Sequence, residues 1–206
     1  MIDDGLVRFL VRSCNYLTWR QLIAMSESDL YPPVNDYLEQ RYREHLRPRY
    51  GDLRSISAIT ATSGGGTFEG KWTRPDLVMA VLWRFAFDLR WTLDLHSFEV
   101  KTEGGCDNVS VHEALSHTAL AHYSYLTWHK PSWDEKNGDC RAIYERCERY
   151  GVGLITFSDP ANSSTYNIRL RSVRHTPNGE AIDEFIETRF PQAERDQLRR
   201  WVQELR

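Results

Sequence analysis

The sequence predicts an α/β domain with a mixed central sheet flanked by helices, and three observations point to it. Apolar and β-branched residues form three strand-like runs between residues 55 and 102, with turn residues between them. Helical spacing of apolar residues precedes and follows these runs. The chain has 206 residues, of which 41% are hydrophobic, and this is enough for one sizeable core. We therefore expect a single domain over residues 1–206.

The segment before the strands favours two helices. Residues 3–25 carry an apolar stripe at helical spacing, and residues 1–27 are expected to form an N-terminal helical extension. The polar stretch over residues 26–29 then predicts a break between helices. Pro32 and Pro33 are expected in the first turn of the second helix, which should end before Pro48.

Three strands should then form an antiparallel meander, over residues 55–62, 76–87 and 93–102. Together with the second helix they begin a predicted core over residues 28–158, and residues 159–206 are expected to add a strand and helices. The later elements are expected in this order: a helix over 109–128, a helix over 139–150 ending at Gly151, a buried strand over 152–157, an edge strand over 166–173, and a charged helical segment over 180–206 interrupted at Pro191.

Composition and charge exclude several classes of protein. The formal net charge of −3 argues against a protein that coats nucleic acid indiscriminately, although positive charge can still gather on one face. The sequence has no apolar run of about 18 residues, so we expect no membrane span and no membrane partner. The N-terminus lacks the basic segment of a signal peptide, and the four cysteines have irregular spacing. We expect a reduced, cytoplasmic protein.

The most informative residues lie at the ends of two predicted strands. Pro75-Asp76 opens the second strand, and Glu99-Val100-Lys101 closes the third. Because alternate residues of a strand share a face, Glu99 and Lys101 should project together, and Asp76 should lie near them if the two strands pair. Two carboxylates suit a Mg²⁺ ion that keeps several waters, and a lysine can orient a water or neutralise developing charge.

These residues resemble the motif of the PD-(D/E)xK nuclease superfamily, whose members have the restriction-endonuclease-like fold. The element order αβββαβ, with the two halves of the motif on the second and third strands, is similar to the common core of that superfamily. The resemblance implies a metal-dependent DNA endonuclease that uses Mg²⁺, for which Mn²⁺ can substitute. Asp76, Glu99 and the backbone carbonyl of Val100 would hold the metal, and Lys101 would position the attacking water. It also implies nucleic acid as the partner, and a homodimer or a larger nuclease complex.

Three further glutamates are candidates to assist the metal. In several branches of this superfamily a glutamate of the first core helix approaches the metal, and the candidates are Glu27, just before that helix, and Glu39, within it. Glu27 is favoured because it lies near the end of an element. Glu113, on the helix that follows the third strand, could join the outer shell of the metal, while His117 on the same helix could contact substrate. Solvent exposure or helix capping would account for the same glutamates.

Other functions remain open at this point. A non-catalytic module of the same fold would bind nucleic acid or protein without cleaving it. Residues 65–72 resemble a phosphate-binding loop, but Trp72 stands where a Mg²⁺-binding hydroxyl is required. The pair His112 and His117 is five residues apart, which places the two side chains about 140° apart on a helix and excludes a shared metal. We expect these histidines on an exposed or half-buried helix face.

Overall fold

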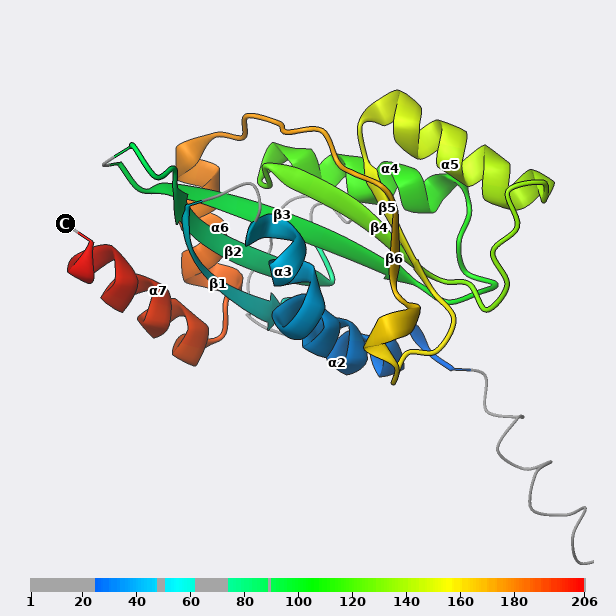
Figure 1. Cartoon of the computed structure of the whole chain (residues 1–206), viewed down its shortest axis with the longest axis horizontal. Helices are drawn as coiled ribbons and strands as arrows, with labels where there is room; N and C mark the ends of the chain where they lie inside the picture. Colours follow the sequence, from blue (N-terminus) through cyan, green and yellow to red (C-terminus); the bar gives the residue numbers. More distant parts are fainter. Residues whose placement is uncertain (1–24, 48–50, 62–73, 89, 206) are drawn as a thin grey trace, which may run out of the picture.

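The computed structural model describes residues 25–47, 51–61, 74–88 and 90–205, which form a mixed sheet with helices on both faces (Figure 1). The sheet has six strands in the spatial order of the sequence. The strands are β1 (Asp52–Ile59), β2 (Leu77–Arg84), β3 (Thr92–Lys101), β4 (Tyr123–His129), β5 (Gly153–Phe157) and β6 (Asn167–Leu170).

Strand directions divide the sheet into two halves that meet at β3. Strands β1, β2 and β3 form an antiparallel meander. Strands β3, β4 and β5 are parallel, and β6 returns antiparallel to β5. Since β3 belongs to both halves, the carboxyl end of β3 lies beside the start of β2 on one side and the end of β4 on the other.

One face of the sheet is covered by the first described helical segment. It comprises α2 (Glu27–Tyr37), a π-helical turn (Leu38–Tyr42) and α3 (Arg43–Leu46). Its buried side chains pack against alternate residues of β2 and β3, including Leu77, Met79, Val81, Phe98 and Val100. Strand residues of the opposite parity therefore face the other side of the sheet.

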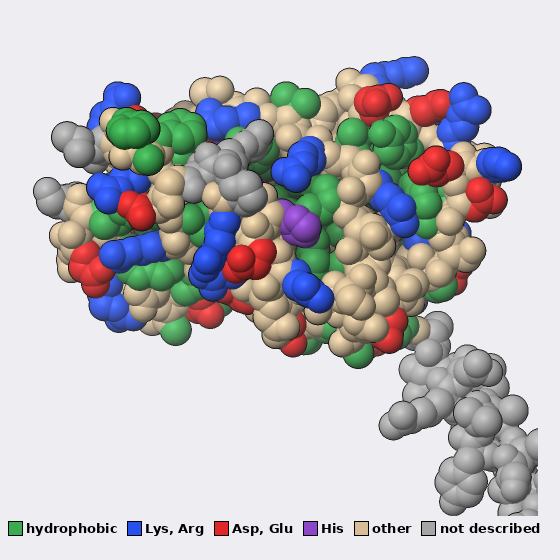
Figure 2. All heavy atoms as spheres, viewed as in Figure 1, with side chains coloured by type: hydrophobic (Ala, Val, Ile, Leu, Met, Phe, Trp, Pro, Cys, Tyr) green, Lys and Arg blue, Asp and Glu red, His purple; other side chains and the backbone are tan. Residues whose placement is uncertain are grey.

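The other face is covered by two pairs of helices. Helices α4 (Asn108–Ser116) and α5 (Gly138–Tyr150) pack on β4 and β5 through a cluster that includes Leu126 and Leu154. Helices α6 (Gly179–Arg189) and α7 (Gln192–Glu204) pack on β1, β2 and β3 through a second cluster. On the face shown in Figure 2, basic and acidic side chains intermingle, in keeping with the small net charge.

The predicted α/β class, with helices on both sides of a mixed sheet, is confirmed. The meander is also present, as are the helix that ends at Gly151 and the C-terminal helices on either side of Pro191. Gly151 adopts a left-handed φ of 70°, the conformation that suits a glycine after a helix. Strand β6 is shorter than the predicted edge strand over 166–173.

Two predictions of local structure are wrong. The predicted helix over 109–128 ends at Ser116, and a short 3-10 turn leads into strand β4, which is buried along almost its whole length. Pro32 and Pro33 lie inside α2, whose first residue is Glu27. The predicted helix over 3–25, the stop at Pro48 and the glycine-rich loop over 65–72 lie outside the described residues. Among the described helices, none has the length and apolar character needed to cross a membrane.

Candidate functional site

The strand register brings the two halves of the motif together. Leu77 pairs with Phe98 in the antiparallel ladder of β2 and β3, so one further step places Asp76 opposite Glu99. The backbone N–H of Val100 donates a 2.8 Å hydrogen bond to Oδ2 of Asp76 and fixes that carboxylate against β3. Asp76, Glu99 and Lys101 are all nearly buried, with 9%, 6% and 8% of their surface exposed.

Lys101 is the centre of the cluster. Its Nζ lies 2.7 Å from Oε1 of Glu99 and 2.9 Å from Oε2 of Glu113. Oε1 of Glu27 lies 3.6 Å from the same nitrogen. Strand β3, helix α4 and helix α2 therefore each contribute one carboxylate to a single ammonium group. We refer to Asp76, Glu99, Lys101, Glu27 and Glu113 as the carboxylate–lysine cluster.

Only two of the three candidate glutamates lie near Lys101. Glu27 and Glu113 belong to the cluster, whereas Glu39 accepts hydrogen bonds from the backbone N–H and the hydroxyl of Ser57, at 2.5 and 2.8 Å. Glu39 thus bridges the first helical segment to β1 and does not contact Lys101. Of these two glutamates, Glu27 is the one whose carboxylate lies near Lys101.

Two side chains, those of Tyr31 and His117, lie next to the cluster although the sequence did not predict these positions. The hydroxyl of Tyr31 on α2 donates a 2.7 Å hydrogen bond to Oδ1 of Asp76. No pattern in the sequence indicates this contact, because a tyrosine on a helix is consistent with simple core packing. His117 lies with its Nε2 3.7 Å from Oε2 of Glu99 and is only 1% exposed, so the expected exposed or half-buried position for it is wrong.

Burial and mutual repulsion perturb the ionisation of the cluster. Burial, together with the negative charge of Asp76, raises the pKa of Glu99 to about 8. Burial also raises the pKa of Asp76, against the hydrogen bonds from Val100 and Tyr31 that favour its charged form. Burial alone would lower the pKa of Lys101, but the surrounding glutamates raise it above its ordinary value. Lys101 is therefore a permanent cation at neutral pH.

The histidine beside Glu99 is held neutral. Complete burial, with the charge of Lys101 nearby, lowers the pKa of His117 to about 3. A neutral imidazole offers Glu99 at most one N–H group and adds no positive charge. The cluster thus holds four acidic side chains and one cation, Lys101.

This excess of carboxylate oxygen fits a divalent cation. Four acidic side chains around one ammonium offer the oxygen ligands that Mg²⁺ prefers, and a bound divalent cation would favour the ionised forms of Asp76 and Glu99. Within the described part of the chain, no three His, Cys, Asp or Glu side chains are grouped closely enough to form a metal site by themselves. Asp76 and Glu99 would therefore supply part of the coordination, and the predicted carbonyl of Val100, water and substrate would complete it.

Comparisons with known proteins show little resemblance. No family model matches the chain, and no curated protein matches it. A solved structure, the SPO1766 protein of unknown function from Silicibacter pomeroyi, is similar with a TM-score of 0.40 and 10% sequence identity. That match covers 85% of this chain and 91% of the other.

Proposed function

We propose that this chain is a metal-dependent nuclease of the restriction-endonuclease-like fold that hydrolyses phosphodiester bonds in DNA. The observation that carries the proposal is the contact between two distant strand ends, where Val100 holds Asp76 beside Glu99 and Lys101. The observed order α2, β1, β2, β3, α4, β4 also supports it, because this is the αβββαβ order that the resemblance implies.

Each residue has a defined part in the proposed chemistry. Asp76 and Glu99, with the carbonyl of Val100, would hold a Mg²⁺ ion, which when bound would neutralise phosphate oxygens and lower the pKa of a bound water. Lys101 remains protonated, so it acts as a hydrogen-bond donor that orients the water and stabilises charge on the phosphorane. Glu113 and Glu27 hold the ammonium of Lys101 in place.

Cleavage of supercoiled plasmid with Mg²⁺ or Mn²⁺ tests this function. The variants Lys101→Ala and Glu99→Gln should each reduce the cleavage rate by about 100-fold or more, since each removes a group that acts on the transition state. Lys136→Ala is the matched control, because Lys136 is an exposed lysine that makes no contact with the cluster. EDTA should abolish cleavage by the wild type.

Two outcomes would reject the proposal. Cleavage that persists in both Lys101→Ala and Glu99→Gln would show that another site or a contaminant is responsible. A wild type that cleaves neither plasmid nor single-stranded DNA with either metal would show that the cluster has no nuclease activity. Circular dichroism of each variant establishes that a lost activity is not a lost fold.

A further inference from the structure

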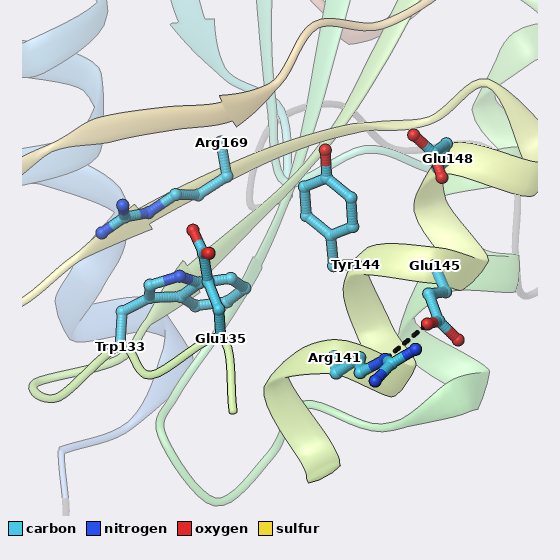
Figure 3. A pocket seen from close by; sticks show the side chains of 7 residues that line it. All are labelled: Trp133, Glu135, Arg141, Tyr144, Glu145, Glu148 and Arg169. Atoms are coloured by element: carbon cyan, nitrogen blue, oxygen red, sulfur yellow. Dashed lines mark hydrogen bonds and ion pairs between the residues drawn. The ribbon is translucent and has the colours of Figure 1, made fainter. Parts of the chain in front are cut away.

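A hollow of about 460 Å³ lies between the loop that follows β4, helix α5 and strand β6 (Figure 3). Figure 3 shows Trp133, Glu135 and Arg169 on one side of it and the side chains of α5 on the other. Its walls combine two aromatic rings with five charged groups, namely Trp133, Glu135, Arg141, Tyr144, Glu145, Glu148 and Arg169. We call it the tryptophan pocket.

Aromatic contacts connect the tryptophan pocket to the carboxylate–lysine cluster. Lys101 pairs with Trp128 in the parallel ladder of β3 and β4, so the two side chains lie side by side on the same face of the sheet. The ring of Trp128 meets the ring of Trp133 edge-on, with 6.3 Å between their centroids. One tryptophan therefore separates the proposed catalytic lysine from the wall of the pocket.

A cation accompanies each of these two rings. Nζ of Lys130 lies 5.0 Å from the centroid of Trp128 but is paired with Oε1 of Glu103 at 3.8 Å, and the guanidinium carbon of Arg169 lies 5.1 Å from the centroid of Trp133. Arg169 is fixed by a hydrogen bond from its Nε to the hydroxyl of Thr156 at 2.9 Å. In the described part of the chain, no carboxylate forms an ion pair with Arg169, so its charge is available to a phosphate.

The acidic side chains that line the pocket favour the binding of a nucleobase over that of a phosphate. Arg141 is already neutralised by Glu145, with Nε 2.6 Å from Oε1. Glu135 and Glu148 have no cationic partner among the described residues, and both are exposed to the pocket. Such carboxylates repel a phosphate group but accept hydrogen bonds from the amino and ring N–H groups of nucleobases.

We propose that the tryptophan pocket binds an unpaired base of the substrate strand while Arg169 contacts a phosphate of that strand. This inference rests on the proposed nuclease function and specifies its substrate class: nucleic acid with a single-stranded segment next to the cleaved bond. A base inside a duplex is stacked and paired and cannot enter a pocket unless it is extruded. An unpaired base enters without that cost and gains stacking on an aromatic side chain.

The opposite end of β3 provides a matched control. Trp91 immediately precedes β3, whereas Lys101 is its last residue. The guanidinium carbon of Arg84 lies 5.1 Å from the ring centroid of Trp91, and Trp91 lines a hollow of about 350 Å³. Trp91 and Trp133 thus both have an arginine over the ring and a hollow beside it. Arg84, however, is paired with Asp52 at 2.5 Å, and Trp91 lies at the opposite end of β3 from Lys101.

Fluorescence anisotropy with labelled oligonucleotides of about 15 nucleotides tests the proposal on the full chain, in EDTA so that nothing is cleaved. The wild type should bind the single strand at least about tenfold more tightly than the same sequence in a duplex. Trp133→Ala should weaken single-strand binding by about tenfold to 100-fold, the range typical of a lost base–aromatic stack. Trp91→Ala should leave it within about twofold.

A second pair of variants keeps the test valid if Trp133→Ala does not fold. Arg169→Gln should weaken binding and reduce its dependence on salt, because one phosphate contact is lost, whereas Arg84→Gln should do neither. The proposed base binding would be wrong if the protein bound duplex and single strand with equal affinity, or if it bound neither. It would also be wrong if the two variants of a pair lost the same affinity. Single-strand binding that needs Trp133 and Arg169, in a protein that cleaves nothing, would support the pocket and reject the nuclease function.

Discussion

Val100 donates its backbone N–H to Oδ2 of Asp76 at 2.8 Å, and this bond joins two strand ends that are 24 residues apart in the sequence. Oδ1 of the same carboxylate accepts from Tyr31 at 2.7 Å. Both oxygens of a nearly buried carboxylate are thus satisfied, one by the sheet and one by helix α2. The position of Asp76 relative to Glu99 is therefore determined by backbone pairing and does not depend on a flexible side chain.

The tyrosine at this carboxylate should contribute measurably to stability. Tyr31→Phe leaves one oxygen of Asp76 without its donor, and we expect the free energy of unfolding to fall by about 1–2 kcal/mol. Urea unfolding at pH 7 in EDTA measures the change. Tyr166→Phe is the comparison, because its hydroxyl donates to a neutral backbone carbonyl, that of Pro160, at 3.1 Å. A loss for Tyr31→Phe no greater than that for Tyr166→Phe would contradict a special role for the contact with Asp76.

Loss of the lysine should lower the free energy of unfolding more than loss of one acidic group of the carboxylate–lysine cluster. Lys101→Met leaves the four acidic side chains without their shared cation, and we expect a cost of about 3 kcal/mol. Glu99, with its pKa raised to about 8, is largely protonated at pH 7, so Glu99→Gln changes little charge there while Lys101 keeps Glu113 at 2.9 Å, and its cost should stay below about 1 kcal/mol. Unfolding of both variants in EDTA tests the inequality.

A lysine outside the cluster provides the reference for that experiment. Lys136→Met at an exposed position should change the free energy of unfolding by no more than about 0.5 kcal/mol. If Glu99→Gln and Lys101→Met cost the same, Lys101 would matter no more to the cluster than one of its acidic side chains, and the prediction would be wrong.

The candidate site was predictable to the extent that strand geometry determines it. Alternation along β3 places Glu99 and Lys101 on one face, and antiparallel pairing brings Asp76 to them. Tyr31 and the neutral His117 were not predictable, because their positions depend on how α2 and the end of α4 pack on the sheet. No local pattern in the sequence encodes that packing.

Strand β4 was wrongly predicted as helix for a different physical reason. Its seven residues are buried on both faces except at the end, so they show no alternation of polar and apolar residues. Val111, Leu115, Ala119, His122 and Leu126 happen to recur at nearly helical intervals across the helix, the turn and the strand. The aromatic and β-branched character of residues 123–128 was the signal that favoured a strand.

Gly153 should be intolerant of any side chain. A Cβ at this position would overlap the ring of Tyr125 and lie 2.9 Å from the backbone nitrogen of Ser172. We expect Gly153→Ala to destabilise the protein by about 1–3 kcal/mol through overpacking. Gly138→Ala is the control, since a Cβ there meets nothing within 4 Å. Thermal unfolding of both variants decides the matter, and equal melting temperatures would show that β5 can shift to make room.

A histidine outside the candidate site should make stability depend on pH. Nδ1 of His122 accepts the backbone N–H of Leu95 at 3.0 Å, and this contact requires a neutral ring. Burial lowers the pKa of His122 below its ordinary value of 6.5, with Arg174 acting in the same direction and Asp94 opposing both. The unfolded chain therefore takes up a proton at a higher pH than the folded chain does.

Because the folded-state pKa is the lower one, the contribution of neutral His122 is complete above about pH 6.5 and is lost as the pH falls below that value. We expect His122→Gln to destabilise the protein most at pH 7.5, and the difference from the wild type to shrink at pH 5.5. Urea unfolding at both pH values measures it, with His112→Gln as the control for loss of an exposed imidazole. A difference that stays constant would mean that folding does not shift the pKa of His122, and one that grows toward pH 5.5 would mean that folding raises it; either result would contradict the prediction.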